Sequence, residues 1–500
     1  MCGIAALHHP QTGPAATTGE RMLAELAHRG PDDRAQLPVG AHAWLGHTRL
    51  SLVDLDGGRQ PLTSADGWAL VCNGEIYDHA DLRAELGEHE FRTSSDSEAA
   101  LVLLRRRGPA ALTRLRGMWA LCAAAPDGRF VAARDRLGIK PLYWAESGGV
   151  RYFASELRAF PAAVRPAVET FPPGCWWTPE DGLVRFADPM PDPAELPSWE
   201  GLAPEVVEKA TREVLVDSVR RHLMADVEVG VFLSGGLDSS VVAAIAAAEC
   251  AEAGTRLKTF AVGTADSPDL LAARAAAEHL GTEHHEAIFD ARRAVAALDD
   301  VVASVESFDA SLVRSAVPNW FLAELAAQHV KAVLTGEGAD ELFAGYGYYH
   351  RAHAEDLQDE LARTLGALHG LNLQRCDRIT MAHGLEARVP FLDTEVVAHA
   401  MSLPEELKAL QGGVEKAHLR RAFTGRLPEE LLWRRKAQFG TGSGAQDLLT
   451  PYWEQRVTPS ELAATDAPVR TREELAYHRT FRRHLDGIRP EAVLTRFATA

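Results

Sequence analysis

The chain has 500 residues, of which 46% are hydrophobic, and carries a formal net charge of -18 at pH 7 with a pI of about 5.6. This length is too great for one ordinary hydrophobic core, so we expect two domains. An acidic chain offers no basic surface for nucleic acid, and no stretch approaches the roughly 18 apolar residues of a membrane span. We therefore expect a soluble cytoplasmic protein without a nucleic-acid or membrane partner.

Cysteine is the second residue of the chain and directly follows Met1. Removal of Met1 would give Cys2 its own α-amine, which titrates at about pH 7.7 to 8 and can act as a base for the adjacent thiol. For Met-Cys-Gly taken alone, a small residue that merely permits removal of Met1 is the stronger interpretation. The six cysteines show no CxxC pair or metal-ligand spacing, so we expect reduced, mainly buried thiols, with Cys2 the exception.

Short apolar runs that end at Gly, Asn or Asp fill the chain from Ile4 to about Trp177. They predict strands closed by tight turns, such as Ala69–Cys72 and Trp119–Ala123. Helical patterns separate them near residues 19–28, 78–87 and 96–107. The first part of the chain is therefore predicted to be a sheet structure covered by helices.

Prolines crowd residues 187–205, which favours extended, exposed backbone and makes this the best domain boundary. Beyond it, apolar strands alternate with Ala-rich helical segments, a pattern that predicts a parallel, doubly wound sheet. The strands are expected at 229–233, 257–262 and 331–335. Residues from about 355 onward are predicted to be mostly helical.

The segment from Ser234 to Ser240 reads SGGLDSS and joins an apolar strand to a helix. Small residues and free backbone amides at a helix N-terminus form an anion site, and Asp238 can hold Mg²⁺ against neighbouring oxygens. A flexible Gly/Ser turn is the alternative, but the complete motif in this position disfavours it. The Walker pattern with its lysine is absent. The segment instead resembles the pyrophosphatase loop of enzymes that split ATP into AMP and pyrophosphate.

A second acidic segment, Thr335 to Glu341, reads TGEGADE and follows another apolar strand. Because ligand crevices of such sheets lie at the carboxyl ends of the strands, both loops can face one ATP molecule. Glu337 could then act as a general base, and Asp340 could join Asp238 around magnesium. A solvated acidic turn is the alternative interpretation.

An ordered set of motifs extends over essentially the whole chain. The set comprises RGPD (29–32), GHTRLS (46–51), NGEIY (73–77), SDSE (95–98), RDRLGIKPLY (134–143), the two loops above, AVG (261–263), SPD (267–269) and GLEARVPFLD (384–393). In this set the chain resembles the glutamine-dependent asparagine synthetase family. The resemblance implies an α/β protein with an αββα N-terminal-nucleophile glutaminase domain at 1–190 and a doubly wound, parallel-sheet ATP-pyrophosphatase synthetase domain at 205–500.

For the first domain, the resemblance implies that Cys2 attacks the glutamine side-chain amide, forming a thioester and releasing ammonia. Arg49 would pair with the glutamine α-carboxylate, and Glu75 and Asp96 would receive its α-amino group. The oxyanion hole would be supplied by Asn73 and Gly74. A guanidinium suits a carboxylate, and preorganised donors stabilise a tetrahedral intermediate. Taken singly, Arg49 or Asp96 would more often be a surface salt-bridge residue.

For the second domain, the resemblance implies that a substrate carboxylate attacks the α-phosphate of ATP and that ammonia then attacks the acyl-adenylate. Lys436 matches the family lysine that meets the phosphates. Arg314 and Arg388 are candidates for the acceptor carboxylates or pyrophosphate, with structural ion pairs as the alternative. The ATP contacts would come from Leu233, Ser234, Gly235, Gly236, Asp238, Ser239, Val262 and Gly336, with Mg²⁺ at Asp238 and Asp340.

The chain departs from the family pattern at two places. Thr335 stands where serine is common, and Ala437 and Phe439–Gly442 replace a segment that usually carries two carboxylates. The GLEARVPFLD motif favours aspartate as the acceptor, by resemblance only, and a glutamine-dependent amidotransferase for another carboxylic acid is the alternative. A catalytically dead regulator is disfavoured because Cys2, Asp238 and Glu337 are all present, and a stand-alone glutaminase because the ATP loop and its acidic partner are intact. The sequence leaves the ammonia channel unassigned and a homodimer open.

Overall fold

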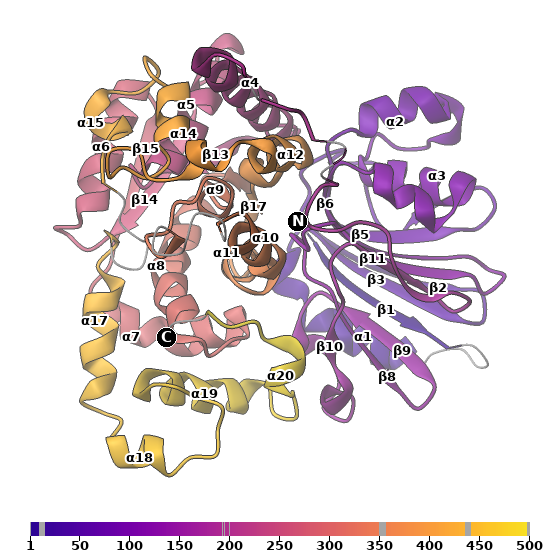
Figure 1. The fold of residues 1–500 in the computed structure, drawn as a ribbon. Coiled ribbons are helices and arrows are strands. Elements are labelled where there is room, and N and C mark those ends of the chain that lie inside the picture. Colours follow the sequence, from indigo (N-terminus) through magenta and orange to yellow (C-terminus); the bar gives the residue numbers. More distant parts are fainter. Residues whose placement is uncertain are drawn as a thin grey trace.

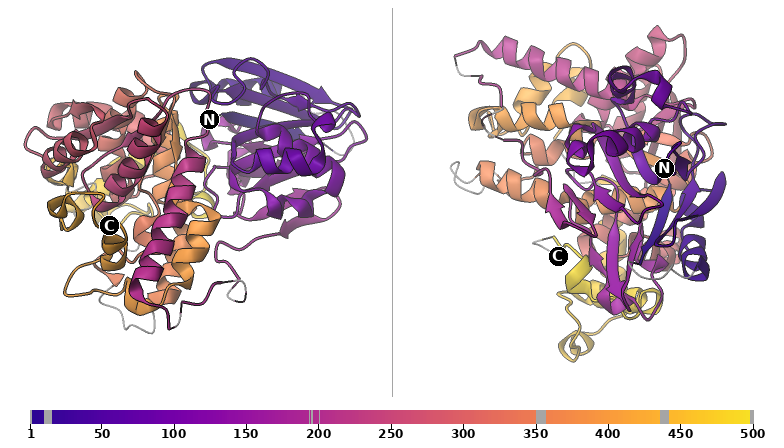
Figure 2. Two further views of the ribbon diagram at one scale, coloured as in Figure 1. Left: turned by 90° about the horizontal axis from the view of Figure 1, so that it is seen from above. Right: turned by 90° about the vertical axis from the view of Figure 1, so that its right-hand side faces the viewer.

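The computed structural model describes residues 2–9, 16–192, 194, 196–199, 201–349, 357–435 and 442–497. Two parts lie side by side in Figures 1 and 2, a sheet-rich part from the first half of the chain and a larger, helix-rich part. The amino-terminal end lies at the junction of these parts (Figures 1 and 2). No helix within the described ranges is long and apolar enough to cross a membrane.

The sheet-rich part holds, among the described residues, two six-stranded antiparallel sheets. The first has the order β10-β8-β9-β1-β3-β2 and the second the order β12-β11-β7-β6-β5-β4. The strands of the first are β1 (Gly3–His8), β2 (Asp33–Val39), β3 (Ala43–Arg49), β8 (Tyr143–Ser147), β9 (Val150–Ala154) and β10 (Glu169–Thr170). Those of the second are β4 (Leu62–Thr63), β5 (Ala69–Ile76), β6 (Gly117–Ala124), β7 (Phe130–Arg134), β11 (Cys175–Thr178) and β12 (Gly182–Arg185).

Alternation along β1 explains how the layers stack. Ile4 and Ala6 belong to the core between the two sheets, whereas Ala5 and Leu7 belong to the core that also contains Met22 of α1 (Ala16–Ala24). Successive strand side chains point to opposite faces, so one strand supplies two cores. On the far side, α3 (Ser97–Arg107) packs on β5, and α2 (His79–Leu86) packs on α3. The predicted αββα order is confirmed.

The larger part is built on a parallel sheet of five strands among the described residues, in the order β15-β14-β13-β16-β17. The order runs outward in both directions from β13, so a switch point lies between β13 and β16, where the carboxyl ends of strands open a ligand crevice. The strands are β13 (Val229–Phe232), β14 (Lys258–Gly263), β15 (Glu283–Ile288), β16 (Ala332–Leu334) and β17 (Glu386–Arg388). The predicted doubly wound parallel sheet is confirmed.

Helices cover this sheet and, as predicted, make up most of the described residues beyond 355, as far as Val493. Those around the strands are α4 (Pro204–His222), α5 (Leu237–Glu252), α6 (Pro268–Leu280), α7 (Ala291–Val305), α8 (Ala310–Ala326), α9 (Ala339–Leu342), α10 (Leu357–Ala367) and α11 (Asn372–Met381). Those that follow are α12 (Thr394–Ser402), α13 (Glu405–Lys408), α14 (Ala417–Ala422), α15 (Glu429–Leu432), α17 (Ala445–Glu454), α18 (Pro459–Ala463), α19 (Arg472–His484) and α20 (Pro490–Val493). Short 3-10 turns include Ala27–Arg29 and Pro390–Leu392.

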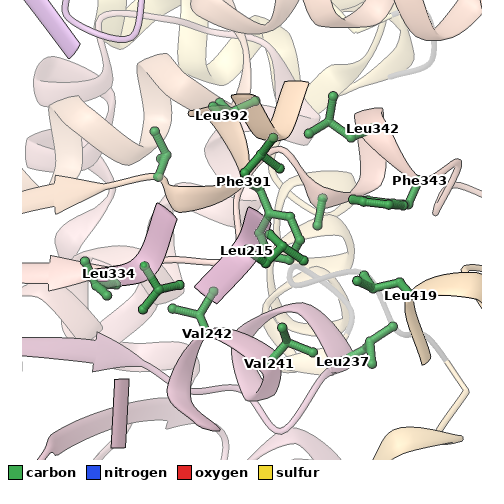
Figure 3. Packing of buried hydrophobic residues seen from close by; sticks show 14 of the residues in the cluster. Leu215, Leu237, Val241, Val242, Leu334, Leu342, Phe343, Phe391, Leu392 and Leu419 are labelled. Carbon is green, nitrogen blue, oxygen red and sulfur yellow. The ribbon is translucent and has the colours of Figure 1, made fainter. Parts of the chain in front are cut away.

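One hydrophobic core packs the central strands against the helices that flank the crevice. Val241 and Val242 of α5 pack with Leu215 of α4 and Phe391, and Figure 3 shows these side chains meeting around the first turns of α5. Because this core fixes the first turns of α5, it also fixes the position of the loop that precedes the helix.

We expect Phe153→Ala to lower the melting temperature of the protein. Phe153 is 0% exposed between the two antiparallel sheets, with its ring centroid 5.4 Å from that of Phe130 and 5.7 Å from that of Trp177. Removal of a buried phenyl ring costs about 3 to 5 kcal/mol, or roughly 6 to 20 °C for a domain of this size. Differential scanning calorimetry measures the shift. The control is Leu183→Ala, whose side chain is 44% exposed and should change the melting temperature little.

Candidate active sites

The first candidate site surrounds Cys2, which directly precedes β1 at the junction of the two parts (Figure 1). Its backbone amide donates to Asn73 Oδ1 at 3.1 Å, and its carbonyl oxygen accepts from Arg29 Nε at 3.0 Å. Cys2 is only 7% exposed, with Asn73 of β5 and Arg29 in contact with its backbone, so it is no exception to the buried thiols. Burial raises the pKa of the Cys2 thiol, which therefore needs a base to react at neutral pH.

Asn73 and Gly74 place hydrogen-bond donors beside Cys2. Asn73 is 0% exposed, and its Nδ2 has no hydrogen-bond partner within the described residues. Gly74 has φ +147°, and a Cβ there would lie 1.9 Å from the carbonyl oxygen of Met118. Only glycine allows the backbone to pass so close to β6. The structure thus brings Cys2, Asn73 and Gly74 together, with a buried donor available for an oxyanion.

Three charged residues surround this pocket. Arg49 donates to the three carbonyl oxygens of residues 53–55 at 2.6 to 3.1 Å and forms no salt bridge with a carboxylate in the described part of the chain. Asp96 accepts from the Ile76 amide at 2.7 Å. Burial, and then the negative charges of Glu386 and Asp96, raise the pKa of Glu75 well above its ordinary value. The groups near Cys2 therefore include the guanidinium of Arg49 and the buried carboxyl groups of Glu75 and Asp96.

The second candidate site is a cavity of about 360 Å³ at the carboxyl ends of the parallel strands. It brings together both loops singled out in the sequence. Its lining includes Leu233, Ser234, Gly236, Asp238, Ser239, Val262, Arg314, Gly336, Glu337 and Asp340. Gly235 is not among the residues that line this cavity. A Cβ at this position would lie 2.4 Å from the backbone of Ala272 in α6, and φ is +68°. Gly235 is required by the close helix packing instead.

The loop before α5 is organised by its own hydroxyl groups. Ser239 Oγ lies 3.1 Å from Ser234 Oγ and accepts from the Ser234 amide at 3.2 Å. Ser234 Oγ in turn accepts from the Gly236 amide at 3.3 Å. The N-terminus of a 16-residue helix therefore meets a cavity edged by hydroxyls and a glycine, which suits a polyphosphate.

Lys416 is a residue of this site that the sequence analysis missed. Its Nζ lies 2.7 Å from both oxygens of Asp238 and 2.5 Å from Asp340 Oδ1, and the side chain lines the cavity. Burial lowers the pKa of the Lys416 ammonium, but Asp238 and Asp340 outweigh it and raise the pKa overall. The two carboxylates therefore converge on one cation. No sequence signal links a lysine 76 positions beyond Asp340 to them.

This convergence fits the predicted metal site. No group of three or more His, Cys, Asp or Glu side chains within the described ranges could hold a metal ion by itself. Mg²⁺, however, is usually held by one or two carboxylates together with substrate phosphate oxygens. Asp238 and Asp340 supply that number of carboxylates at a point already arranged for positive charge.

Two further lining residues were also missed. Arg375 of α11 forms an ion pair with Glu337, so the predicted base is oriented by a guanidinium from a distant helix. Asn319 of α8 lines the cavity, is 4% exposed, and has no hydrogen-bond partner for Nδ2 within the described residues. Ser311, Ser315, Asn319 and Leu322 recur at helical spacing, so one face of α8 forms this wall. Polar residues at helical spacing in this otherwise apolar segment are the sequence signal that could have identified Asn319 as a lining residue.

The two predicted arginines have different positions. Arg314 lines the cavity, with its Nε 2.9 Å from Glu473 Oε2. Arg388 does not line it: the side chain is 0% exposed and pairs with Glu386 and Glu75. This position matches the structural ion pair that was the alternative for Arg388, because β17 directs its side chain toward the first part of the chain. Lys436 lies outside the described residues, whereas its neighbours Arg434 and Arg435 line the cavity.

Comparison with known proteins matches two family models to different parts of the chain. A family model described as a glutamine amidotransferase domain matches residues 1–171, and the asparagine synthase model matches residues 210–367 and 352–495. A probable glutamine-hydrolyzing asparagine synthetase of Schizosaccharomyces pombe is 39% identical, over 96% of this chain and 93% of its own. Asparagine synthetase B of Escherichia coli is 38% identical, over 87% and 81% respectively. The chain belongs to the asparagine synthase family.

In this asparagine synthase family member, we expect Lys416→Met to lower the melting temperature at neutral pH. The substitution leaves Asp238 and Asp340 facing each other without the ammonium, and removal of one partner from a buried ion pair costs about 3 to 5 kcal/mol. Added Mg²⁺ should restore more of the melting temperature in the variant than it adds to the unsubstituted protein. Differential scanning fluorimetry measures both effects.

The matched control is Lys331→Met. Lys331 Nζ lies 2.7 Å from Asp32, but its side chain is 41% exposed, so the loss should be below about 1 kcal/mol. Equal melting temperatures for Lys416→Met and the unsubstituted protein would contradict a role of Lys416 as the counter-ion.

Proposed function

We propose that this chain converts aspartate to asparagine with ammonia released from glutamine, and splits ATP into AMP and pyrophosphate. A glutaminase domain would span residues 1–190 and a synthetase domain residues 205–500. The observation that carries the proposal is the presence of two sites in one chain: a buried Cys2 beside an amide donor that has no hydrogen-bond partner among the described residues, and a cavity that suits a polyphosphate. Relatives at 38 to 39% identity are named as glutamine-hydrolyzing asparagine synthetases.

At the first site, the Cys2 sulfur would attack the side-chain carbonyl carbon of glutamine. After loss of Met1, the α-amine of Cys2 takes the thiol proton and passes it to the leaving nitrogen, so the C–N bond breaks and ammonia departs. Asn73 Nδ2 and the Gly74 amide stabilise the oxyanion. Water then hydrolyses the thioester to glutamate. Arg49 binds the substrate α-carboxylate, and Glu75 and Asp96 bind its ammonium group.

At the second site, a carboxylate oxygen of aspartate would attack the α-phosphorus of ATP, and pyrophosphate leaves. Ammonia then attacks the acyl carbon of the adenylate, the C–O bond breaks, and AMP leaves. Glu337, oriented by Arg375, accepts the proton that the attacking nitrogen loses. The amides and hydroxyls of residues 234–239 hold the phosphates. Lys436 is assigned to the phosphates by its family motif.

Magnesium belongs to this proposal as a partner of the nucleotide. Asp238 and Asp340 would hold it, and its chemistry there is to neutralise phosphate charge that develops as pyrophosphate departs. Lys416 already provides one positive charge between these carboxylates. Its ammonium keeps Asp238 and Asp340 close together before a nucleotide arrives.

The acceptor acid is tested by pyrophosphate release with ATP, magnesium and ammonium. We expect strong dependence on aspartate and the appearance of asparagine, compared with a panel of other small carboxylic acids. Because adenylation precedes amide formation, pyrophosphate is released only with an acid that the protein adenylates, so its release identifies the acceptor acid. Silence with aspartate and a signal from another acid would move the protein to the amidotransferases for that acid.

We expect Cys2→Ala to abolish glutamine-dependent asparagine formation, on the order of a thousandfold or more, because the nucleophile is lost. Synthesis from added ammonium should continue at nearly the original rate, since the cavity does not include Cys2. Asparagine is measured by chromatography with each nitrogen source. Cys122→Ala is the matched control, a thiol that is 0% exposed in the core between the sheets and should leave both reactions active. Loss of both reactions in Cys2→Ala alone would argue against separable sites.

A further inference from the structure

Arg388 is enclosed at the junction of the two parts. It ends β17, and its guanidinium meets groups from three different segments. Nε lies 2.5 Å from Glu386 Oε1, and one terminal nitrogen lies 3.5 Å from Glu75 Oε2 of the first part. The other donates to the carbonyl oxygens of His222 and Met224, at 2.7 and 2.5 Å, where α4 ends. The side chain is therefore fixed in position by a strand neighbour and a helix end.

The backbone of Arg388 reaches the opposite site. Its carbonyl oxygen accepts from the Thr335 amide at 2.9 Å and lies 3.3 Å from Thr335 Oγ1. Thr335 follows β16, lines the cavity, and begins the loop that carries Glu337. Parallel pairing of Leu334 with Arg388 sets this register. One residue thus contacts the cavity loop through its backbone and the Cys2 pocket through its side chain.

The position of the Glu75 carboxylate depends on the Arg388 side chain. It is 5% exposed, and Oε2 has no hydrogen-bond partner within the described residues. Burial and neighbouring carboxylates raise the pKa of Glu75, whereas the charge of Arg388 lowers it. Glu386 makes the shorter contact to Arg388, so the longer contact at 3.5 Å orients the Glu75 carboxylate while its Oε2 keeps its hydrogen-bonding capacity for a second cation.

We propose that Arg388 is a positioning residue through which the synthetase part completes the glutamine pocket. Its guanidinium holds the Glu75 carboxylate for the glutamine ammonium group, and its carbonyl ties that arrangement to the Thr335–Glu337 loop. Glutamine binding therefore depends on how the cavity loop is seated. This inference rests on the proposed glutaminase reaction.

The experiment compares the unsubstituted protein with Arg388→Gln, Arg388→Lys and the double variant Glu386→Gln/Arg388→Gln. The double variant removes one charge of each sign, which protects folding if Arg388→Gln alone leaves too many buried carboxylates. Glutamate release gives the KM for glutamine and kcat, with and without ATP plus aspartate. Ammonium-dependent pyrophosphate release reports the cavity and the folded state in the same preparations.

We expect the KM for glutamine to rise at least about tenfold in Arg388→Gln and in the double variant, since one partner of a buried charge pair is gone. Ammonium-dependent pyrophosphate release should stay within about threefold. Arg388→Lys, which keeps a charge, should recover part of the KM. If ATP and aspartate change the KM for glutamine in the unsubstituted protein, this change should be smaller in Arg388→Gln and in the double variant.

Arg116→Gln is the matched control. Arg116 also joins the two parts, with Nε 3.1 Å from Asp393 Oδ2, but it does not touch Glu75. It should leave the KM for glutamine unchanged. Three outcomes would overturn the role of Arg388. They are an unchanged KM for glutamine in both Arg388→Gln and the double variant, an equal rise of this KM in Arg116→Gln, and a parallel loss of glutamate release and pyrophosphate release. Failure of the unsubstituted protein to release glutamate would instead refute the proposed function.

Discussion

The buried guanidinium of Arg29 joins the reactive end of the chain to the second part of the molecule. Arg29 is 0% exposed, and one terminal nitrogen lies 2.8 Å from Glu156 of the first part and 2.9 Å from Asp377 of α11. Its Nε also donates to the carbonyl oxygen of Cys2. The position of the nucleophile is therefore set by a contact between the two parts, and neither part alone supplies the whole arrangement.

Helix α11 extends this dependence to the other site. Residues two positions apart on a helix point to nearly opposite sides, so Asp377 faces Arg29 while Arg375 faces Glu337 in the cavity. Only the width of one helix, about 10 Å, separates these two ion pairs. The strand residue Arg388 makes a second connection through its backbone and side chain. The two sites share structural elements as well as a chain.

Buried ion pairs are a costly way to join two parts, because desolvation of the charges can exceed their attraction. Their value here lies in geometry. Arg29, Arg378 and Arg388 are each at most 1% exposed and have carboxylate partners from more than one segment, so a shifted docking would leave several charges unpaired at once. Apolar contacts between the parts would tolerate such a shift more readily, since they have no directional partners.

The sequence by itself determined the architecture and most of the local chemistry. Residues 234–240 and 335–341 could be assigned because each loop directly follows an apolar strand, and parallel strands open their ligand crevice at that end. Short apolar runs ended by Gly, Asn or Asp likewise predicted the strands of the first part, and the family resemblance implied that they form two stacked sheets. These features depend on neighbours in the chain, and periodicity and motifs record such neighbours.

The counter-ions were decided only by the tertiary structure. Lys416 between Asp238 and Asp340, Arg375 beside Glu337, and Arg388 beside Glu75 all come from segments far along the chain. The GLEARVPFLD motif singled out Arg388, but only the direction of β17 places its side chain beside Glu75 and away from the cavity. Pairing of buried charges depends on packing in space, and sequence spacing carries no record of which distant side chains meet.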